Sequence, residues 1–294
     1  MATTLVAATS PAEPAVVEHA PARSRWSTTR CVVALDRSLI DAAHSHCSSR
    51  WPVTRPTTTR TGRSPSTSAM HSRSPTVPHG SAICSTPTSG DRRFDPDLIL
   101  MTAVRHEDLY DEFSAIAPTV ATESAGGGWK DNIRLIAAAT GRTELGEQVL
   151  ADYEARAAEV GAAVNAAADD PTISVVRFAD AIRLYQPVSF SGVVLEDAGL
   201  SRPESQQDRD DFIAIISEEE LGLADADVLI YTIAAHDAVE KMAGEVQERP
   251  LWQSLSAVQT GNAHPVLDDS WMSGVGVFGA RLILDDLETI FGVG

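Results

Sequence analysis

The sequence predicts an α/β fold in which two Rossmann-like lobes are joined by a single long α-helix. Strand-like apolar segments alternate with helical segments on both sides of residues 129–168, which implies mostly parallel sheets in both halves. Within 129–168 only Gly141 interrupts the helical periodicity. The helix expected from Thr143 to Ala168 is about 26 residues, or roughly 39 Å, long. That is far longer than a usual crossover between neighbouring strands, so it is expected to connect the lobes.

The pattern within this segment is that of an amphipathic surface helix. Apolar side chains recur at steps of three and four, while most charged residues fall off that stripe. Thr143 is a plausible N-cap, and Asp169-Asp170-Pro171 is expected to end the helix. The stripe consists of Leu145, Val149, Tyr153, Ala157, Val160, Val164 and Ala167.

Short elements are expected on either side of the long helix. Buried or hairpin strands are indicated by apolar runs bounded by turn residues, and helices by apolar residues at helical spacing. The strands are expected at 31–36, 97–102, 118–122, 172–178, 181–185, 212–216, 228–233 and 263–266. The helices are expected at 38–43, 107–116, 190–198, 236–246, 251–258 and 274–291, with a capping box at Ser217-Glu218-Glu219-Glu220.

Size and charge limit the class of protein. A chain of 294 residues can form two domains, each with its own core. The net charge of −18 argues against a partner that is a nucleic acid or an anionic membrane. Residues 94–294 carry 36 acids and 12 bases, whereas residues 44–93 carry one acid and seven arginines. Such a break in composition marks a domain edge or a segment of different origin.

Residues 44–93 interrupt the expected first lobe. They contain twenty Ser or Thr and six Pro, and neither a helical nor a strand period continues through them. A disordered linker has this composition, but fifty structureless residues inside a compact domain are improbable. We favour out-of-frame translation over a native linker. The expected domains are a disordered N-terminus at 1–27, a first lobe at 28–128 that is incomplete or disordered over 44–93, connecting helices at 129–168 and a second lobe at 169–294.

Known catalytic and metal-binding motifs are missing from the sequence. There is no GxSxG, no phosphate loop, and no GxGxxG after a strand; Gly274-Val275-Gly276 fits close helix packing better. His106-Glu107-Asp108 and His236-Asp237 begin helices, so capping is favoured over metal binding. Cys31, Cys47 and Cys84 show no CxxC spacing. We therefore expect neither catalysis nor a metal or cofactor held by protein side chains.

Arginines and aromatic residues stand at the expected strand ends. Ligands of open α/β sheets bind outside the carboxyl ends of the strands, and guanidinium groups with aromatic faces suit a large anionic or oxygen-rich ligand. An equally weighted alternative makes the arginines solvated surface residues and the tryptophans core residues. The candidate ligand-binding residues are Arg105, Trp129, Arg177, Tyr185 and Trp271.

Several blocks in order resemble one family. FDPDLILMTAVRHEDLYDEFSAIAPTV, WKDNIRLIAAATGR, PLWQSLSAVQTGNAHPV and DDSWMSGVGVFGARLILDDLE resemble the ferric-siderophore substrate-binding proteins of ABC importers. The resemblance covers residues 94–294 and a fragment at 32–43. It implies two α/β lobes joined by one rigid helix, with a ferric siderophore held between them and delivered without turnover to an importer permease. The siderophore itself would coordinate the iron.

The resemblance also implies roles for particular residues. Arg105 falls where relatives carry a first-lobe cleft arginine, Arg177 is the second candidate, and Glu219 matches the second-lobe glutamate that docks the importer. Relatives with a Ser-Arg-Phe-Gly-like turn gain a further arginine, but residues 189–192 here read Ser-Phe-Ser-Gly. A hydroxamate or mixed siderophore is therefore favoured over a catecholate. The first-lobe docking glutamate is missing, because TSGDRRF replaces its block.

The resemblance implies an extracytoplasmic monomer, although the first residues show neither a complete signal peptide nor a lipobox cysteine. Three alternatives stay open. One is a haem- or corrinoid-binding protein of the same fold. The others are a cytoplasmic α/β enzyme and a non-functional remnant, for which residues 44–93 are the argument.

Overall fold

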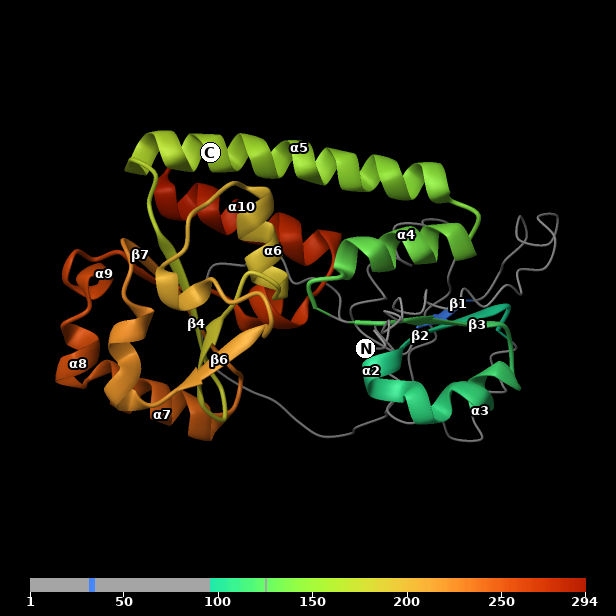
Figure 1. Cartoon of the computed structure of the whole chain (residues 1–294), viewed down its shortest axis with the longest axis horizontal. Coiled ribbons are helices and arrows are strands. Elements are labelled where there is room, and N and C mark those ends of the chain that lie inside the picture. Colours follow the sequence, from blue (N-terminus) through green and yellow to red (C-terminus); the bar gives the residue numbers. More distant parts are fainter. Residues whose placement is uncertain (1–31, 35–95, 125) are drawn as a thin grey trace, which may run out of the picture.

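The computed structural model describes residues 32–34, 96–124 and 126–294, which form two α/β lobes beneath one long helix (Figure 1). The first lobe contains a three-stranded parallel sheet in the order β1-β2-β3. The expected helix at 38–43 and the stretches 1–27 and 44–93 lie outside the described residues. The strands of this sheet are β1 (Val32–Ala34), β2 (Leu98–Thr102) and β3 (Thr119–Thr122).

Both faces of strand β2 are buried in the first lobe. Leu98 and Leu100 pack against Ile136 of helix α4 (Trp129–Ala139) on one face. On the other face Met101 packs with Phe113. The single helix expected at 107–116 is instead broken into short pieces. These are η3 (Glu107–Leu109) and α3 (Tyr110–Ser114), and a further short helix that was not predicted, α2 (Ala103–His106), precedes them.

The long helix is α5 (Thr143–Ala168), with the bounds predicted from the sequence. It runs above both lobes, and α4 packs beneath its first half (Figure 1). The expected N-cap is wrong by one residue: Arg142 is the N-cap, and Thr143 is already helical. The helix ends as predicted, because Asp169 and Asp170 adopt left-handed backbone angles (φ 58° and 55°) that break the helical path.

Helix α4 belongs to the cores of both lobes. Trp129, at its start, is buried in the core of the second lobe, and Ile133 packs against the same core. Ile136, one turn later, packs on the sheet of the first lobe. The joint between the lobes therefore includes α4 as well as α5.

The second lobe contains a mixed five-stranded sheet in the order β6-β5-β4-β7-β8. Strand β5 runs antiparallel to its neighbours β4 and β6, while β4, β7 and β8 are parallel. The hairpin of β4 and β5 is the one predicted at 172–185. The strands are β4 (Ile173–Phe178), β5 (Ile182–Tyr185), β6 (Ile213–Ile216), β7 (Val228–Ile233) and β8 (Ala263–Pro265).

Helices cover both faces of this sheet. One face packs against α5, α6 (Phe190–Asp197) and α10 (Val277–Phe291), the last two lying toward the first lobe (Figure 1). The other face packs against the outer helices α7 (Asp237–Gln247), α8 (Pro250–Gln253), α9 (Ser256–Gln259) and η5 (Glu218–Ala224). The helix expected at 251–258 is two short helices, and the last helix begins at Val277 rather than at 274. Among the described residues, no helix combines the length and apolarity needed to cross a membrane.

Candidate functional site

A row of side chains crosses the second sheet at the carboxyl ends of β4 and β7. Arg177 of β4 lies opposite Arg183 of β5 on one side and beside Thr232 of β7 on the other. Ile215 of β6 continues the row beyond Arg183. Because pairs in register project to the same face of a sheet, these residues share the face that α6 covers farther along the strands. We call Ile215, Arg183, Arg177 and Thr232 the strand-end row.

The strand-end row begins where the apolar core ends. The preceding row on the same face contains Tyr185, Val175 and Ile230, which all belong to the core. Beyond it, two arginines replace the apolar side chains. The carboxyl ends of strands in open α/β sheets are where ligands bind, so this row is the candidate site in the second lobe.

Arg177, a predicted site residue, is held by three interactions. Its Nε and Nη2 donate to the two oxygens of Asp268 at 2.7 and 2.8 Å, and its Nη1 donates to the Tyr185 hydroxyl at 3.2 Å. Asp268 also accepts a hydrogen bond from the Thr232 hydroxyl at 3.0 Å. Burial lowers the pKa of the guanidinium, but the bonds to Tyr185 and Asp268 outweigh it, and the pKa is raised above its ordinary value. Arg177 therefore stays charged and fixed.

Arg183 was not among the predicted site residues. Its Nη2 donates to Asp180 in the hairpin turn, and its Nε is buried without a hydrogen-bond partner. The Asp180 side chain is 77% exposed, whereas that of Asp268 is 14% exposed. Two signals in the sequence could have indicated Arg183: it alternates with Tyr185 along β5, and it lies in the same predicted hairpin as Arg177.

The two predicted tryptophans are core residues in this structure. Trp129 is 1% exposed and packs edge-on against Tyr153 and Phe190, with ring centroids 5.0 and 6.1 Å apart. Trp271 is fully buried, and its Nε1 donates to Asp286 at 2.8 Å. Trp271 is enclosed beside α10, whereas the ring of Trp129 also lines a small pocket at the joint between the lobes. Tyr185 is also nearly buried, with only its hydroxyl directed toward the strand-end row.

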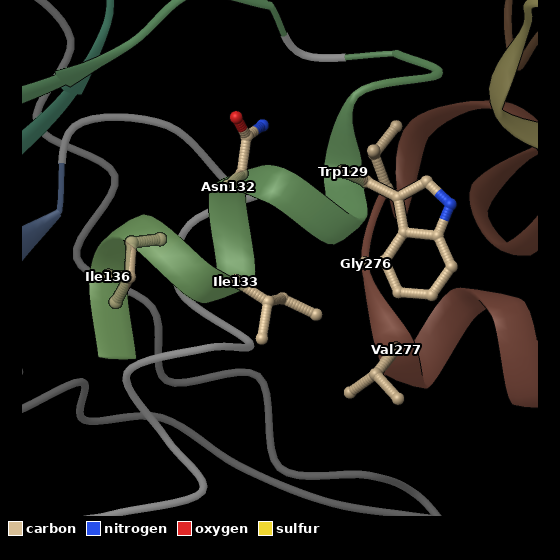
Figure 2. Close-up of a pocket in the computed structure, with 7 residues that line it drawn as sticks. Trp129, Asn132, Ile133, Ile136, Gly276 and Val277 are labelled. Carbon is tan, nitrogen blue, oxygen red and sulfur yellow. The ribbon is translucent and has the colours of Figure 1, made fainter. Parts of the chain in front are cut away.

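A small pocket lies at the joint between the lobes, where α4 meets the start of α10 (Figure 2). Its cavity volume is about 10 Å³, roughly the room that one water molecule needs and far below the volume of a small-molecule site. The lining is mostly apolar, so it differs in chemistry from the strand-end row. The lining residues are Trp129, Asn132, Ile133, Ile136, Val275, Gly276 and Val277.

Arg105, the predicted first-lobe arginine, lies on α2, directly after the carboxyl end of β2. Its side chain is exposed. Helix α2 stands on the side of the first lobe that faces the second lobe (Figure 1). The helix that carries Arg105 therefore lies on the side of the first lobe nearer the second lobe.

Glu219 differs from the two glutamates that flank it. Glu218 forms an ion pair with Arg249 at 3.3 Å, and Glu220 accepts from the backbone N–H of Ser217 at 2.9 Å in the predicted capping box. Glu219 is exposed, and hydrogen bonds from its own backbone and from Ser217 lower the pKa of its carboxyl. Its carboxylate is therefore ionised and presented at the surface.

Within the part of the chain that the structure describes, no group of three or more His, Cys, Asp or Glu side chains could hold a metal ion. The expected capping role differs between the two histidines: His106 is the last residue of α2 and makes no side-chain capping bond to η3, and its Nδ1 is buried without a hydrogen-bond partner. His236 is the N-cap of α7, and its Nδ1 accepts from the backbone N–H of Ala238 at 3.2 Å.

Comparison with known proteins identifies the family. Residues 93–263 match the model of the periplasmic binding protein family, which is more than half of the chain. The chain belongs to this family. It is a family of substrate-binding proteins, which counts against the enzyme interpretation. The family resemblance noted in the sequence and the predicted α/β fold with two lobes are confirmed.

Two relatives carry names that state a binding function. The chain is 41% identical over 208 residues to the probable siderophore-binding lipoprotein YfiY of Bacillus subtilis, covering 67% of this chain and 63% of that protein. It is 26% identical over 211 residues to the achromobactin-binding periplasmic protein of Dickeya dadantii, covering 67% of each. The match to YfiY thus spans less than two thirds of that protein's length.

A solved structure has the same fold. The structure of Staphylococcus aureus SirA complexed with staphyloferrin B superposes with a TM-score of 0.64 at 29% sequence identity. The superposition covers 70% of this chain and 75% of SirA.

Proposed function

We propose that this protein captures a ferric siderophore between its two lobes and delivers it to an ABC importer. The observation that carries the proposal is the strand-end row, in which charged arginines replace apolar side chains at the carboxyl ends of the strands. Family membership and the siderophore-binding relatives support the same ligand class. The site has no resident cofactor in this proposal, because the siderophore supplies the ligands of the iron.

The ligand would contact arginines of both lobes. Arg105 would serve the first lobe, and the strand-end row, in which Arg177 holds the Tyr185 hydroxyl, would serve the second. Guanidinium groups favour the negatively charged oxygens of a ferric complex. Residues 189–192 contain no arginine that could add a positive charge. In this turn the Ser189 hydroxyl instead caps α6 by accepting from the backbone N–H of Gly192 at 3.1 Å. A hydroxamate or mixed siderophore therefore stays favoured over a catecholate.

Importer docking is assigned to Glu219 in the second lobe. All three consecutive glutamates are exposed, but Glu218 pairs with Arg249 and the Glu220 side chain caps its own helix, so we assign the docking role to Glu219. An ionised carboxylate at a fixed surface position suits an arginine of a permease. In transport assays with the matching permease, Glu219→Gln should abolish uptake without changing ligand affinity. Loss of ligand binding in this variant would contradict the docking role.

The proposed location is outside the cytoplasm, where the protein acts as a monomer. The incomplete first lobe stays a prediction that concerns residues 44–93. Limited proteolysis and thermal melting test it directly. A single cooperative transition with 44–93 resistant to protease would contradict it.

Tryptophan fluorescence titration tests the ligand class. Ferric citrate, ferrioxamine B, ferric enterobactin, haem and a corrinoid are each added to the purified chain. Quenching by a ferric complex at micromolar concentration or below is expected, and quenching by haem or corrinoid alone would favour the alternative ligands of this fold. Binding of none of the ferric complexes would refute the proposed function.

A further inference from the structure

We propose that Arg183, rather than Arg177, is the second-lobe anchor for one negatively charged oxygen of the ligand, and that the strand-end row selects ferric complexes of low negative charge. This inference rests on the proposed function and specifies which residue contacts the ligand. It starts from the two arginines that oppose each other in register on β4 and β5. Like charges directly opposite each other destabilise a sheet, so each needs a counter-charge.

The counter-charges of the two arginines are not equivalent. Arg177 and Asp268 form a bidentate pair with side chains only 20% and 14% exposed. Arg183 pairs through one nitrogen with Asp180, whose side chain is 77% exposed and adjoins the hairpin turn. The two arginines are about equally exposed (22% and 20%), but the exposed carboxylate of Asp180 is more easily exchanged for another anion than the buried one of Asp268.

The donors of the two guanidinium groups differ as well. All three nitrogens of the Arg177 guanidinium group donate hydrogen bonds, Nε and Nη2 to Asp268 and Nη1 to the Tyr185 hydroxyl. The Nε of Arg183 is buried without a partner. A buried donor without a partner is unfavourable, so a ligand oxygen that draws the Arg183 side chain outward would relieve this unfavourable position and supply an acceptor. Arg177 is thus a positioning residue that orients Tyr185, while Arg183 is available to the ligand.

The charge of the row sets the ligand class. The two arginines are balanced by Asp268 and Asp180, so the row has no excess positive charge to offset a strongly anionic complex. Iron bound by three catecholates carries a large negative charge, whereas hydroxamates leave the complex close to neutral and carboxylate groups lie between. The row therefore fits a hydroxamate or a complex with a free carboxylate that binds Arg183.

The test compares charge variants of the full chain by fluorescence titration with ferric citrate, ferrioxamine B and ferric enterobactin. Arg183→Gln should weaken binding of the best anionic probe about tenfold or more and reduce the salt dependence of its affinity. Arg183→Lys should restore part of that affinity. Asp180→Asn, which leaves Arg183 in place, should strengthen it. The matched control is Lys241→Gln, which removes an exposed charge from the outer helix α7.

The outcomes separate this inference from the proposed function. If the unmodified chain binds a ferric probe and Arg183→Gln binds it equally well, Arg183 is not the anchor while siderophore binding stands. If Lys241→Gln weakens binding as much as Arg183→Gln, only the overall charge matters and the inference is overturned. If the unmodified chain binds none of the ferric probes, both proposals fail. Asp268→Asn removes one negative charge from the row, so it should improve the affinity for ferric enterobactin relative to that for ferrioxamine B. If the ratio of these two affinities is unchanged, the proposed selection by charge is overturned.

Discussion

Helix α5 packs so closely on α6 that Gly161→Ala should destabilise the protein. Gly161 is buried where α5 crosses the end of α6. A Cβ atom at this position would stand 1.6 Å from the carbonyl oxygen of Ala198 and 2.5 Å from its carbonyl carbon. Both atoms belong to the backbone, so no side-chain rotation relieves the clash, and the two helices must move apart.

The magnitude follows from two opposing effects. Alanine is favoured over glycine inside a helix by about 1 kcal/mol. Overpacking of this severity costs at the upper end of the usual range, about 3 kcal/mol. The net loss is about 2 kcal/mol, which for a folded part of roughly 150–250 residues lowers Tm by about 4–8 °C.

Thermal melting followed by circular dichroism measures this loss, with Gly244→Ala as the matched control. Gly244 lies within α7, and an added Cβ would meet no atom within 4 Å. This variant keeps the gain in helix propensity without the clash, so its Tm should rise by a few degrees. A Tm for Gly161→Ala equal to or above that of the unmodified chain would refute the close approach of α5 to α6.

The carboxylates of Asp286 and Asp227 should make the thermal stability of the fold depend on pH in opposite directions. Burial raises the pKa of Asp286, so ionisation of this carboxyl destabilises the fold as pH rises above the ordinary pKa of an aspartate, about 4. Asp286→Asn keeps an acceptor for the Trp271 N–H. This variant should therefore raise Tm at pH 7 but not below about pH 4. Hydrogen bonds from the Thr172 hydroxyl and backbone lower the pKa of Asp227, whose stabilisation is present above about pH 4 and lost as pH falls further. Asp227→Ala should therefore lower Tm at pH 7 and have little effect near pH 2. Melting each variant across this pH range checks both, and parallel pH profiles for variant and unmodified chain would contradict the assignment.

The sequence predicted the secondary structure well in segments where an apolar pattern repeats over many residues. The bounds of α5 follow from its apolar stripe and from the Asp169-Asp170-Pro171 stop. The β4–β5 hairpin follows from its two apolar runs. The short helices η3 and α3 and the two helices at 250–259 were merged in the prediction, because runs of about one turn carry too little periodicity to show a break.

The candidate site was predictable in part. The sequence itself determined the α/β class, the long helix between the lobes, and the position of Arg177 and Tyr185 at strand ends. Only the tertiary structure showed that Trp271 is buried and that Asp268, 91 residues away in the chain, neutralises Arg177. Burial and ion pairing depend on which segments meet in space, and sequence spacing does not contain that information. The register that sets Arg183 opposite Arg177 likewise emerges only when the two strands pair.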